Sequence, residues 1–184
     1  SMLFNTVDED TDSGMTDKQV RDEAVTLYLA GHETTANTMK WTWYLLSQHP
    51  AAEAELHAEL DSVLGGRPPT LADLDRLPYT EWVIKEALRL YPPAYGFSRL
   101  AKEPLTIGGY AIPAGAFLHV VPYLTHRDPR FHPDPDAFKP ERFANDAEKQ
   151  WPRYAYFPFG GGPRVCIGNT FALMEARLIL ATVA

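Results

Sequence analysis

The sequence predicts a mainly α-helical fold with a small β-sheet. A helical pattern extends over residues 16–48, and the stretches 50–64 and 79–90 also have the apolar spacing of amphipathic helices. Strand signals are confined to residues 97–121. More than half of the 16 prolines fall between Pro113 and Pro163, which predicts a stretch that is irregular but rigid.

Length and charge set limits on the class of protein. The 184 residues suffice for one domain, and 45% apolar with 22% charged residues excludes wholesale disorder. The net charge of −7 argues against broad capture of nucleic acid, so no nucleic-acid partner is expected. No apolar run approaches the roughly 20 residues of a membrane span, and no signal peptide is visible. A soluble, cytoplasmic protein is therefore expected.

The long helix follows a polar N-terminal segment. Residues 1–15 predict a flexible lead-in, and Ser1-Met2 resembles a cloning scar. Thr16 and Gln19 have the spacing of a capping box, which predicts the helix start. At 1.5 Å per residue, a helix of this size is roughly 48 Å long. Because that exceeds the width of an ordinary domain of this size, the helix suits the spine of a larger molecule.

Proline and glycine set the bounds of the next helices. Pro50 suits the first turn of a helix that ends near Leu64, before Gly65-Gly66. A short helix is expected over residues 71–77. The helix over residues 79–90 is closed by Pro92-Pro93.

The remaining elements lie in the second half of the chain. Residues 105–107 and 110–112 predict a hairpin around Gly108-Gly109, with further strands at residues 97–101 and 117–121. Residues 128–163 should be mostly loop. A final helix should begin near Cys166 or Gly168 and continue to the last residue.

A run of small and polar residues interrupts the pattern of the long helix. Gly31 costs about 1 kcal/mol inside a helix, and the Thr34 hydroxyl can bond the carbonyl four residues earlier. Such a break predicts a groove beside Glu33, with close packing through small residues as the alternative. The zinc pattern H-E-x-x-H fails, because Ala36 occupies the second histidine position.

Glu86 and Arg89 lie three residues apart on one helix face. An exposed pair of this kind contributes little and is common. Arg142 by itself predicts no site. It would indicate one only if Glu86 is buried and needs a second arginine to neutralise its charge.

The segment from Phe157 to Gly168 carries the strongest signal. Its glycine run lets the backbone approach something flat and bulky, and the lone cysteine, Cys166, lies at a helix start whose dipole favours a thiolate. A phosphate-binding loop is excluded, because Pro163-Arg164 replaces the required Gly-Lys-Ser/Thr.

Three interpretations of Cys166 remain from the residues alone. It could be a soft metal ligand, with Arg164 pairing an anionic group of a cofactor. It could be a buried cysteine in a tight loop. It could also be a nucleophile, for which the candidate bases are His119, His126 and His132.

Four motifs together resemble one family. Phe159-x-x-Gly162-x-Arg164-x-Cys166-x-Gly168 resembles the haem-binding loop of the cytochrome P-450 haem-thiolate monooxygenases. The other matches, in the family's order, are Ala30-Gly31-x-Glu33-Thr34-Thr35, Glu86-x-x-Arg89 and Pro140-Glu141-Arg142-Phe143. The resemblance covers residues 16–184 and implies the C-terminal portion of a cytochrome P-450 fold, truncated at both ends.

The resemblance implies a role for each matching residue. Cys166 would be the axial thiolate ligand of the iron in haem b. Glu33 and Thr34 match the catalytic acid–alcohol pair that delivers protons. The residues implied in haem binding are Ala30, Gly31, Arg99, Phe159, Gly162, Arg164 and Gly168. A buried charge triad would comprise Glu86, Arg89 and Arg142. The residues that fall where the family lines its substrate pocket are Ala94, Tyr95 and Phe97.

The implied activity is insertion of one atom of O2 into an apolar small-molecule substrate. Electrons would come from a ferredoxin- or flavodoxin-type donor, which the basic residues near Cys166 could contact. One alternative is a peroxide-using relative, against which Glu33 and Thr34 argue. Another is a haem-free structural or binding fragment, which could bury exposed apolar surface in a homodimer. A membrane anchor in a preceding N-terminal part is the alternative to a cytoplasmic location.

Overall fold

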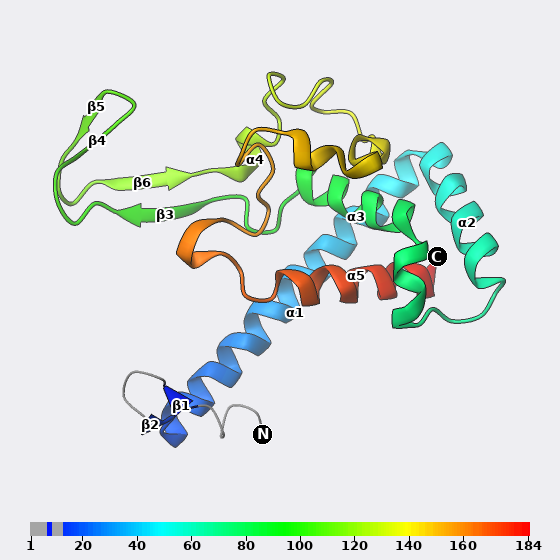
Figure 1. Cartoon of the computed structure of the whole chain (residues 1–184), viewed down its shortest axis with the longest axis horizontal. Helices are drawn as coiled ribbons and strands as arrows, with labels where there is room; N and C mark the ends of the chain where they lie inside the picture. Colours follow the sequence, from blue (N-terminus) through cyan, green and yellow to red (C-terminus); the bar gives the residue numbers. More distant parts are fainter. Residues whose placement is uncertain (1–6, 9–12) are drawn as a thin grey trace.

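The computed structural model describes residues 7–8 and 13–184. Four longer helices dominate it, namely α1 (Asp17–Gln48), α2 (Pro50–Leu64), α3 (Pro78–Leu90) and α5 (Asn169–Val183). Helices α1, α3 and α5 contact one another, and α2 packs beside α1 and α3 (Figure 1). The strands of residues 97–120 extend away from this helical body on one side (Figure 1). The prediction of a mainly helical fold with little β-structure is confirmed.

Helix α1 has the predicted capping box. The Thr16 hydroxyl accepts from the Gln19 amide at 3.3 Å, and Gln19 Oε1 accepts from the Thr16 amide at 2.9 Å. All but one of its buried residues lie in the last eleven positions, the exception being Val20. Only the C-terminal third of the helix is therefore packed in the core, and the rest projects from the helical body (Figure 1).

The next elements also follow their local signals. Pro50 opens α2, and Gly65 closes it in the left-handed region at φ 58°. The short helix expected over residues 71–77 is the 3₁₀-helix η2 (Leu71–Arg76). Helix α3 begins at Pro78, one residue before the predicted start.

The small amount of β-structure that the sequence predicts is divided into separate two-stranded pairs. Strand β3 (Phe97–Leu100) pairs antiparallel with β6 (Phe117–Val120), while β4 (Leu105–Ile107) and β5 (Tyr110–Ile112) form a hairpin. Gly108 and Gly109 both have positive φ, which is why a two-residue turn joins that hairpin. The hairpin lies between β3 and β6 in the chain and pairs with neither of them.

The lead-in predicted over residues 1–15 lies mostly outside the described residues. Its described parts form a two-residue antiparallel pair, β1 (Val7–Asp8) with β2 (Ser13–Gly14). The flexibility of this segment stays a prediction.

The proline-rich stretch is irregular, as predicted, with three short helices inside it. These are α4 (Pro122–Thr125), η3 (Pro140–Gln150) and η4 (Gly162–Arg164). The final helix, α5, begins at Asn169, so Cys166 lies in the loop three residues before it and not in its first turn.

A core of aliphatic side chains joins α1, α2, α3 and α5. Its fully buried members include Leu46, Leu56, Val83, Ile84 and Leu180. Among the described residues, no helix combines the length and apolar character needed to span a membrane.

Candidate functional site

The Cys166 loop is shaped by glycines. Gly160 and Gly162 have φ of 75° and 71°, a region that disfavours side chains. A Cβ on Gly161 would lie 2.4 Å from Tyr154 Cε1, so no larger residue fits there without moving the ring. These constraints explain why three consecutive glycines precede Cys166.

Two backbone hydrogen bonds close this loop. The Gly160 amide donates to the Phe157 carbonyl at 2.9 Å, and the Cys166 amide donates to the Phe159 carbonyl at 3.0 Å. Phe159 is half-buried against the helical core, whereas Cys166 is exposed. The interpretation of Cys166 as a buried structural cysteine is therefore wrong. The loop fixes the main chain to the core and presents the thiol at the surface.

The small-residue run of α1 lies in its exposed part. The Thr34 hydroxyl donates to the Ala30 carbonyl at 2.6 Å, as the sequence predicts. The helix nevertheless continues without a break, so the expected opening of its backbone into a groove is absent. Glu33 is exposed, and nothing lies within 4 Å of a Cβ placed on Gly31. The run therefore presents an open surface with an acid and an alcohol side by side.

Glu86, Arg89 and Arg142 are in contact. Arg89 Nε and Nη2 donate to the two Glu86 carboxylate oxygens at 2.7 and 2.8 Å, and both side chains are fully buried. Arg142 Nε donates to Glu86 Oε1 at 3.4 Å, and the Lys139 amide donates to the same oxygen at 3.0 Å. One buried carboxylate is thus neutralised by two guanidinium groups. This is the condition under which the sequence indicates a structural role for Arg142.

The same two arginines hold the proline-rich stretch. Arg89 donates to the carbonyls of His126, Pro135 and Ala137. Arg142 donates to those of Pro133 and Asp134. This charge cluster therefore fixes the irregular chain that leads to the Cys166 loop.

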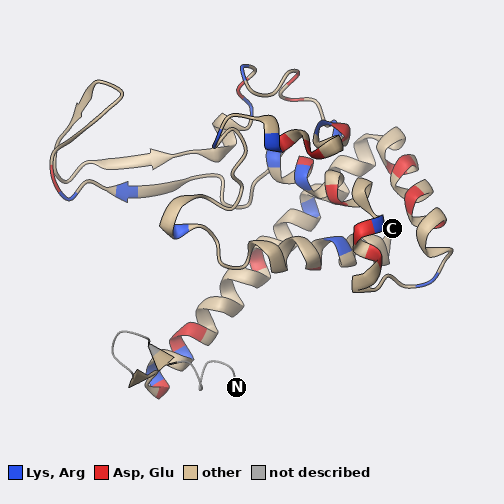
Figure 2. Ribbon diagram, in the orientation of Figure 1, with Lys and Arg blue, Asp and Glu red and all other residues tan. Residues whose placement is uncertain are grey.

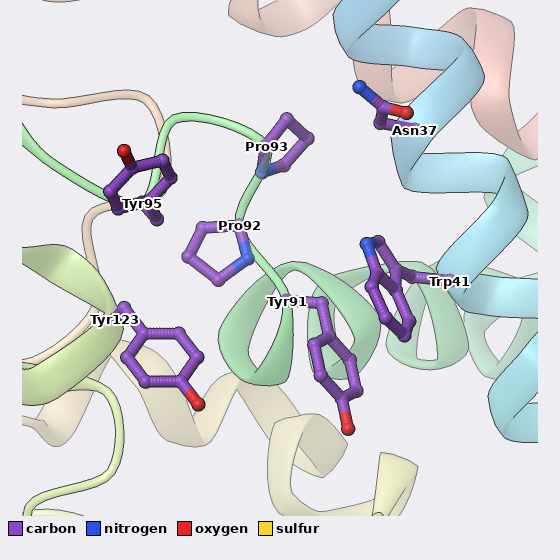
Figure 3. Close-up of a pocket in the computed structure, with 7 residues that line it drawn as sticks. All are labelled: Asn37, Trp41, Tyr91, Pro92, Pro93, Tyr95 and Tyr123. Atoms are coloured by element: carbon purple, nitrogen blue, oxygen red, sulfur yellow. The ribbon is translucent and has the colours of Figure 1, made fainter.

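Of the three predicted pocket residues, Tyr95 lines a cavity that the other two do not line. This cavity, of about 420 Å³, lies between α1 and the segments after α3 and β6 (Figure 3). Trp41 and Tyr91 stack on one side of it at 4.1 Å between ring centroids, and Tyr95 and Tyr123 approach from the other (Figure 3). The remaining lining residues are Asn37, Pro92 and Pro93.

Ala94 and Phe97 lie elsewhere. Ala94 is exposed. The Phe97 ring lies beside the cysteine loop, 3.9 Å from a Cβ placed on Gly160. Phe97 therefore links β3 to the loop that carries Cys166.

Arg99 and Arg164 are exposed cations available to a ligand. Basic residues occur on β3 and on the loop before α5, whereas the charged residues of α2 are all acidic (Figure 2). Within the described part of the chain, no carboxylate forms an ion pair with either guanidinium. Arg99 donates only to the Ser98 carbonyl and lies over the Phe97 ring.

Two of the three histidines proposed as bases for a nucleophilic Cys166 are buried in structural positions. His126 and His132 are fully buried, and each bonds through Nε2 to the backbone of the segment before the loop. His119 Nδ1 bonds the Ser98 hydroxyl at 2.8 Å. The structural roles of His126 and His132 were missed by the sequence interpretation.

The whole chain matches one family. The model of the cytochrome P450 family matches residues 1–183. The chain belongs to the cytochrome P450 family. Its motifs, including the cysteine loop, are therefore those of a cytochrome P450.

Relatives and solved structures agree. The chain is 48% identical over 184 residues to cyclooctatin synthase and 42% identical to cyclooctat-9-en-7-ol 5-monooxygenase, both from Streptomyces melanosporofaciens. It covers 40% of each relative's length. A crystal structure of a cytochrome P450DA mutant heme domain superposes with a TM-score of 0.93 and 35% identity, over 99% of this chain and 40% of the other. The chain thus corresponds to part of a P450 heme domain.

Membership of the family implies haem, and the described residues fit this group. Haem is flat and largely apolar, and it carries anionic propionates. Beside the exposed Cys166, Ile167 is 92% and Phe171 62% exposed, which leaves apolar surface for such a group to cover. Arg99 and Arg164 supply guanidinium groups suited to carboxylates.

Proposed function

We propose that this chain is the haem-binding portion of a monooxygenase that inserts one atom of O2 into an apolar organic substrate. The observation that carries the proposal is the loop that presents an exposed thiol, Cys166, from a rigid backbone. Cys166 would be the axial ligand of haem b, which supplies the oxygen chemistry when bound. Around it, Phe159, Gly162 and Gly168 would shape the loop, and Arg99 and Arg164 would hold the propionates.

Glu33 and Thr34 are proposed to deliver protons to the reaction. They lie on the exposed part of α1, next to the small residues Ala30 and Gly31, which leave room for a ligand. Because the Thr34 hydroxyl donates its one proton to the Ala30 carbonyl, its oxygen is free to accept a hydrogen bond from a water. To pass a proton on, the hydroxyl would rotate away from that carbonyl and donate to the reacting group instead. This pair favours an O2-using enzyme over a peroxide-using relative, which does not need the relay.

The proposed class of substrate rests on the side chains that line the aromatic cavity. Tyr95 lines the aromatic cavity together with Trp41 and Tyr91, whereas Ala94 and Phe97 lie outside it and would contact substrate only beyond this cavity. Apolar and aromatic walls suit an apolar substrate. The names of the two Streptomyces relatives, one of which is a monooxygenase of a cyclic alcohol, are compatible with this class.

The electron donor is proposed to be of ferredoxin or flavodoxin type, an acidic partner for a basic face. Of the five basic residues near Cys166, Arg142 is bound to the buried Glu86. The exposed candidates for this contact are Lys139, Lys149, Arg153 and Arg164.

The test is the absorption spectrum of the 184-residue chain with haem. After reduction and exposure to carbon monoxide, the Soret band should shift to the red, as expected of a thiolate ligand. Cys166→Ser should bind haem more weakly and lack this shift, while His119→Gln, which changes an exposed-site histidine, should behave as wild type. A spectrum that carbon monoxide does not change would contradict the proposal and favour a haem-free binding fragment, for which a homodimer in sedimentation would be the supporting result.

A further inference from the structure

His126 lies fully buried between the charge cluster and the cysteine loop. Its ring contacts Tyr156 and Phe157, with centroid separations of 5.2 and 5.4 Å. The Phe157 amide donates to His126 Nε2 at 2.9 Å. The ring therefore satisfies a buried backbone donor that no secondary structure pairs.

The backbone of His126 is held from the opposite side. Arg89 Nη1 donates to the His126 carbonyl at 2.8 Å, and the same guanidinium is bound to the buried Glu86. The His126 amide donates to the Pro122 carbonyl at 2.8 Å. Both the amide and the carbonyl of His126 are thus fixed by hydrogen bonds. The backbone therefore holds the ring where its Nε2 can accept the hydrogen bond from the Phe157 amide.

Phe157 in turn is the first residue of the cysteine loop. Its carbonyl accepts from Gly160, and the Phe159 carbonyl accepts from Cys166. A continuous series of hydrogen bonds and short covalent steps therefore joins Arg89 to Cys166 by way of the His126 ring. Each bond lies at 2.8 to 3.0 Å.

The protonation of the ring suits this role. Because Nε2 accepts, the neutral imidazole carries its proton on Nδ1. Burial lowers the pKa of His126 to about 3, so the ring is neutral near neutral pH. His132 has the opposite arrangement, with its Nε2 at 2.9 Å from the Ala155 carbonyl, to which it donates. The two rings therefore hold residues 155–157, His132 by donating to the Ala155 carbonyl and His126 by accepting from the Phe157 amide.

We infer that His126 is a positioning residue, which couples the Glu86–Arg89–Arg142 cluster to the loop that presents Cys166. The inference rests on the proposed function, in which the direction of that thiol decides whether the iron is bound. Without the ring, the Phe157 amide is left buried and unpaired, and the loop loses the contact that connects it to Arg89.

The first experiment measures hydrogen exchange by mass spectrometry in the 184-residue chain without haem. His126→Leu should exchange the amides of peptides covering residues 157–168 at least about tenfold faster than wild type. His126→Gln, whose Oε1 can accept from the Phe157 amide, should restore most of the protection. Leu56→Ala, which opens a cavity in the core away from the loop, is the control for general loss of stability.

The outcomes distinguish positioning from mere stability. Loop-specific acceleration with rescue by glutamine supports the inference. Unchanged loop exchange, or acceleration of all amides as in Leu56→Ala, overturns it. If His126→Leu does not fold, His126→Asn is used in its place, because the shorter asparagine side chain does not reach the Phe157 amide. Faster loop exchange in His126→Asn than in His126→Gln would then support the inference, and equal exchange would overturn it.

A second readout uses haem. In His126→Leu, the share of the red-shifted carbon monoxide band should fall at least threefold relative to wild type, and His126→Gln should recover it. An undiminished share would overturn the coupling. If wild type itself binds no haem, the proposed function fails for this chain, while the exchange experiment still decides the role of His126.

Discussion

At the scale of single residues, the buried ionisable groups of this chain are kept in one protonation state by their surroundings. Glu86 accepts from Arg89, Arg142 and the Lys139 amide. His126 has no acid beside it, and burial together with nearby cations keeps its ring neutral. The buried carboxylate is thus surrounded by hydrogen-bond donors, whereas the buried imidazole, which has no such compensation for a positive charge, stays neutral.

The neutral histidines make stability depend on pH. Burial lowers the pKa of both His126 and His132 below the usual 6.5, and the charges of Arg89 act in the same direction on both. The unfolded chain takes up these protons near pH 6.5, whereas the folded chain does not. Stability is therefore fully present above pH 6.5 and falls below it, with a limiting slope of about 1.4 kcal/mol per pH unit for His126.

His126→Gln should remove one histidine's share of this slope. Between pH 6.5 and 5.0, wild type should lose about 2 kcal/mol more unfolding free energy than the variant. Urea denaturation at several pH values, followed by circular dichroism, measures the difference. This window lies above the range in which exposed carboxylates titrate, so parallel pH dependences of the two proteins would contradict the prediction.

At the scale of elements, α3 is capped by a side chain from α2. Glu59 accepts from the Tyr79 and Thr80 amides at 2.6 and 2.9 Å, and from the Thr80 hydroxyl at 2.7 Å. The residue before α3, Leu77, provides no side-chain cap. The carboxylate therefore satisfies free amides at the positive end of the helix dipole and joins the two helices.

Glu59→Ala should lower the unfolding free energy by about 1–2 kcal/mol, because two amides at the start of α3 lose their acceptor. Glu55→Ala is the matched control on the same helix, since it removes an exposed carboxylate that accepts no hydrogen bond from α3. Chemical denaturation of both variants measures the loss. Equal effects of the two substitutions would show that the cap is not what stabilises this end.

Elements whose signals are local could be predicted from the sequence. The Thr16 capping box, Pro50 and Gly108-Gly109 each act within a few residues, and their helix or turn forms as predicted. The arrangement of the strands could not be predicted in the same way. Strand β6 pairs with β3 across a gap that includes the β4–β5 hairpin, and nothing local indicates that the hairpin stays separate. Of the two predicted starts of α5, the later one is confirmed, with Gly168 as the residue that caps the helix.

At the scale of the whole molecule, distant segments meet at the charge cluster. Glu86 and Arg89 come from α3 and Arg142 from η3, and their bonds also reach the chain between α4 and η3. The motifs allowed this contact to be predicted, since each has a fixed place in the family's order. The role of His126 could not be predicted from the sequence, because it depends on a hydrogen bond from a backbone amide 31 positions further along the chain.

The cluster should therefore decide whether the chain folds. Glu86→Gln removes the negative charge and leaves two guanidinium groups buried or nearly buried without a counter-ion. The expected loss is about 3–5 kcal/mol, a large share of the 5–15 kcal/mol that stabilises an ordinary domain. Asp22→Asn is the control, because its ion pairs with Lys18 and Arg21 are exposed to solvent and should contribute little to stability. Urea denaturation measures both variants. A loss in Glu86→Gln as small as that in Asp22→Asn would mean that the irregular chain from His126 to Arg142 is held by its packing and not by this carboxylate.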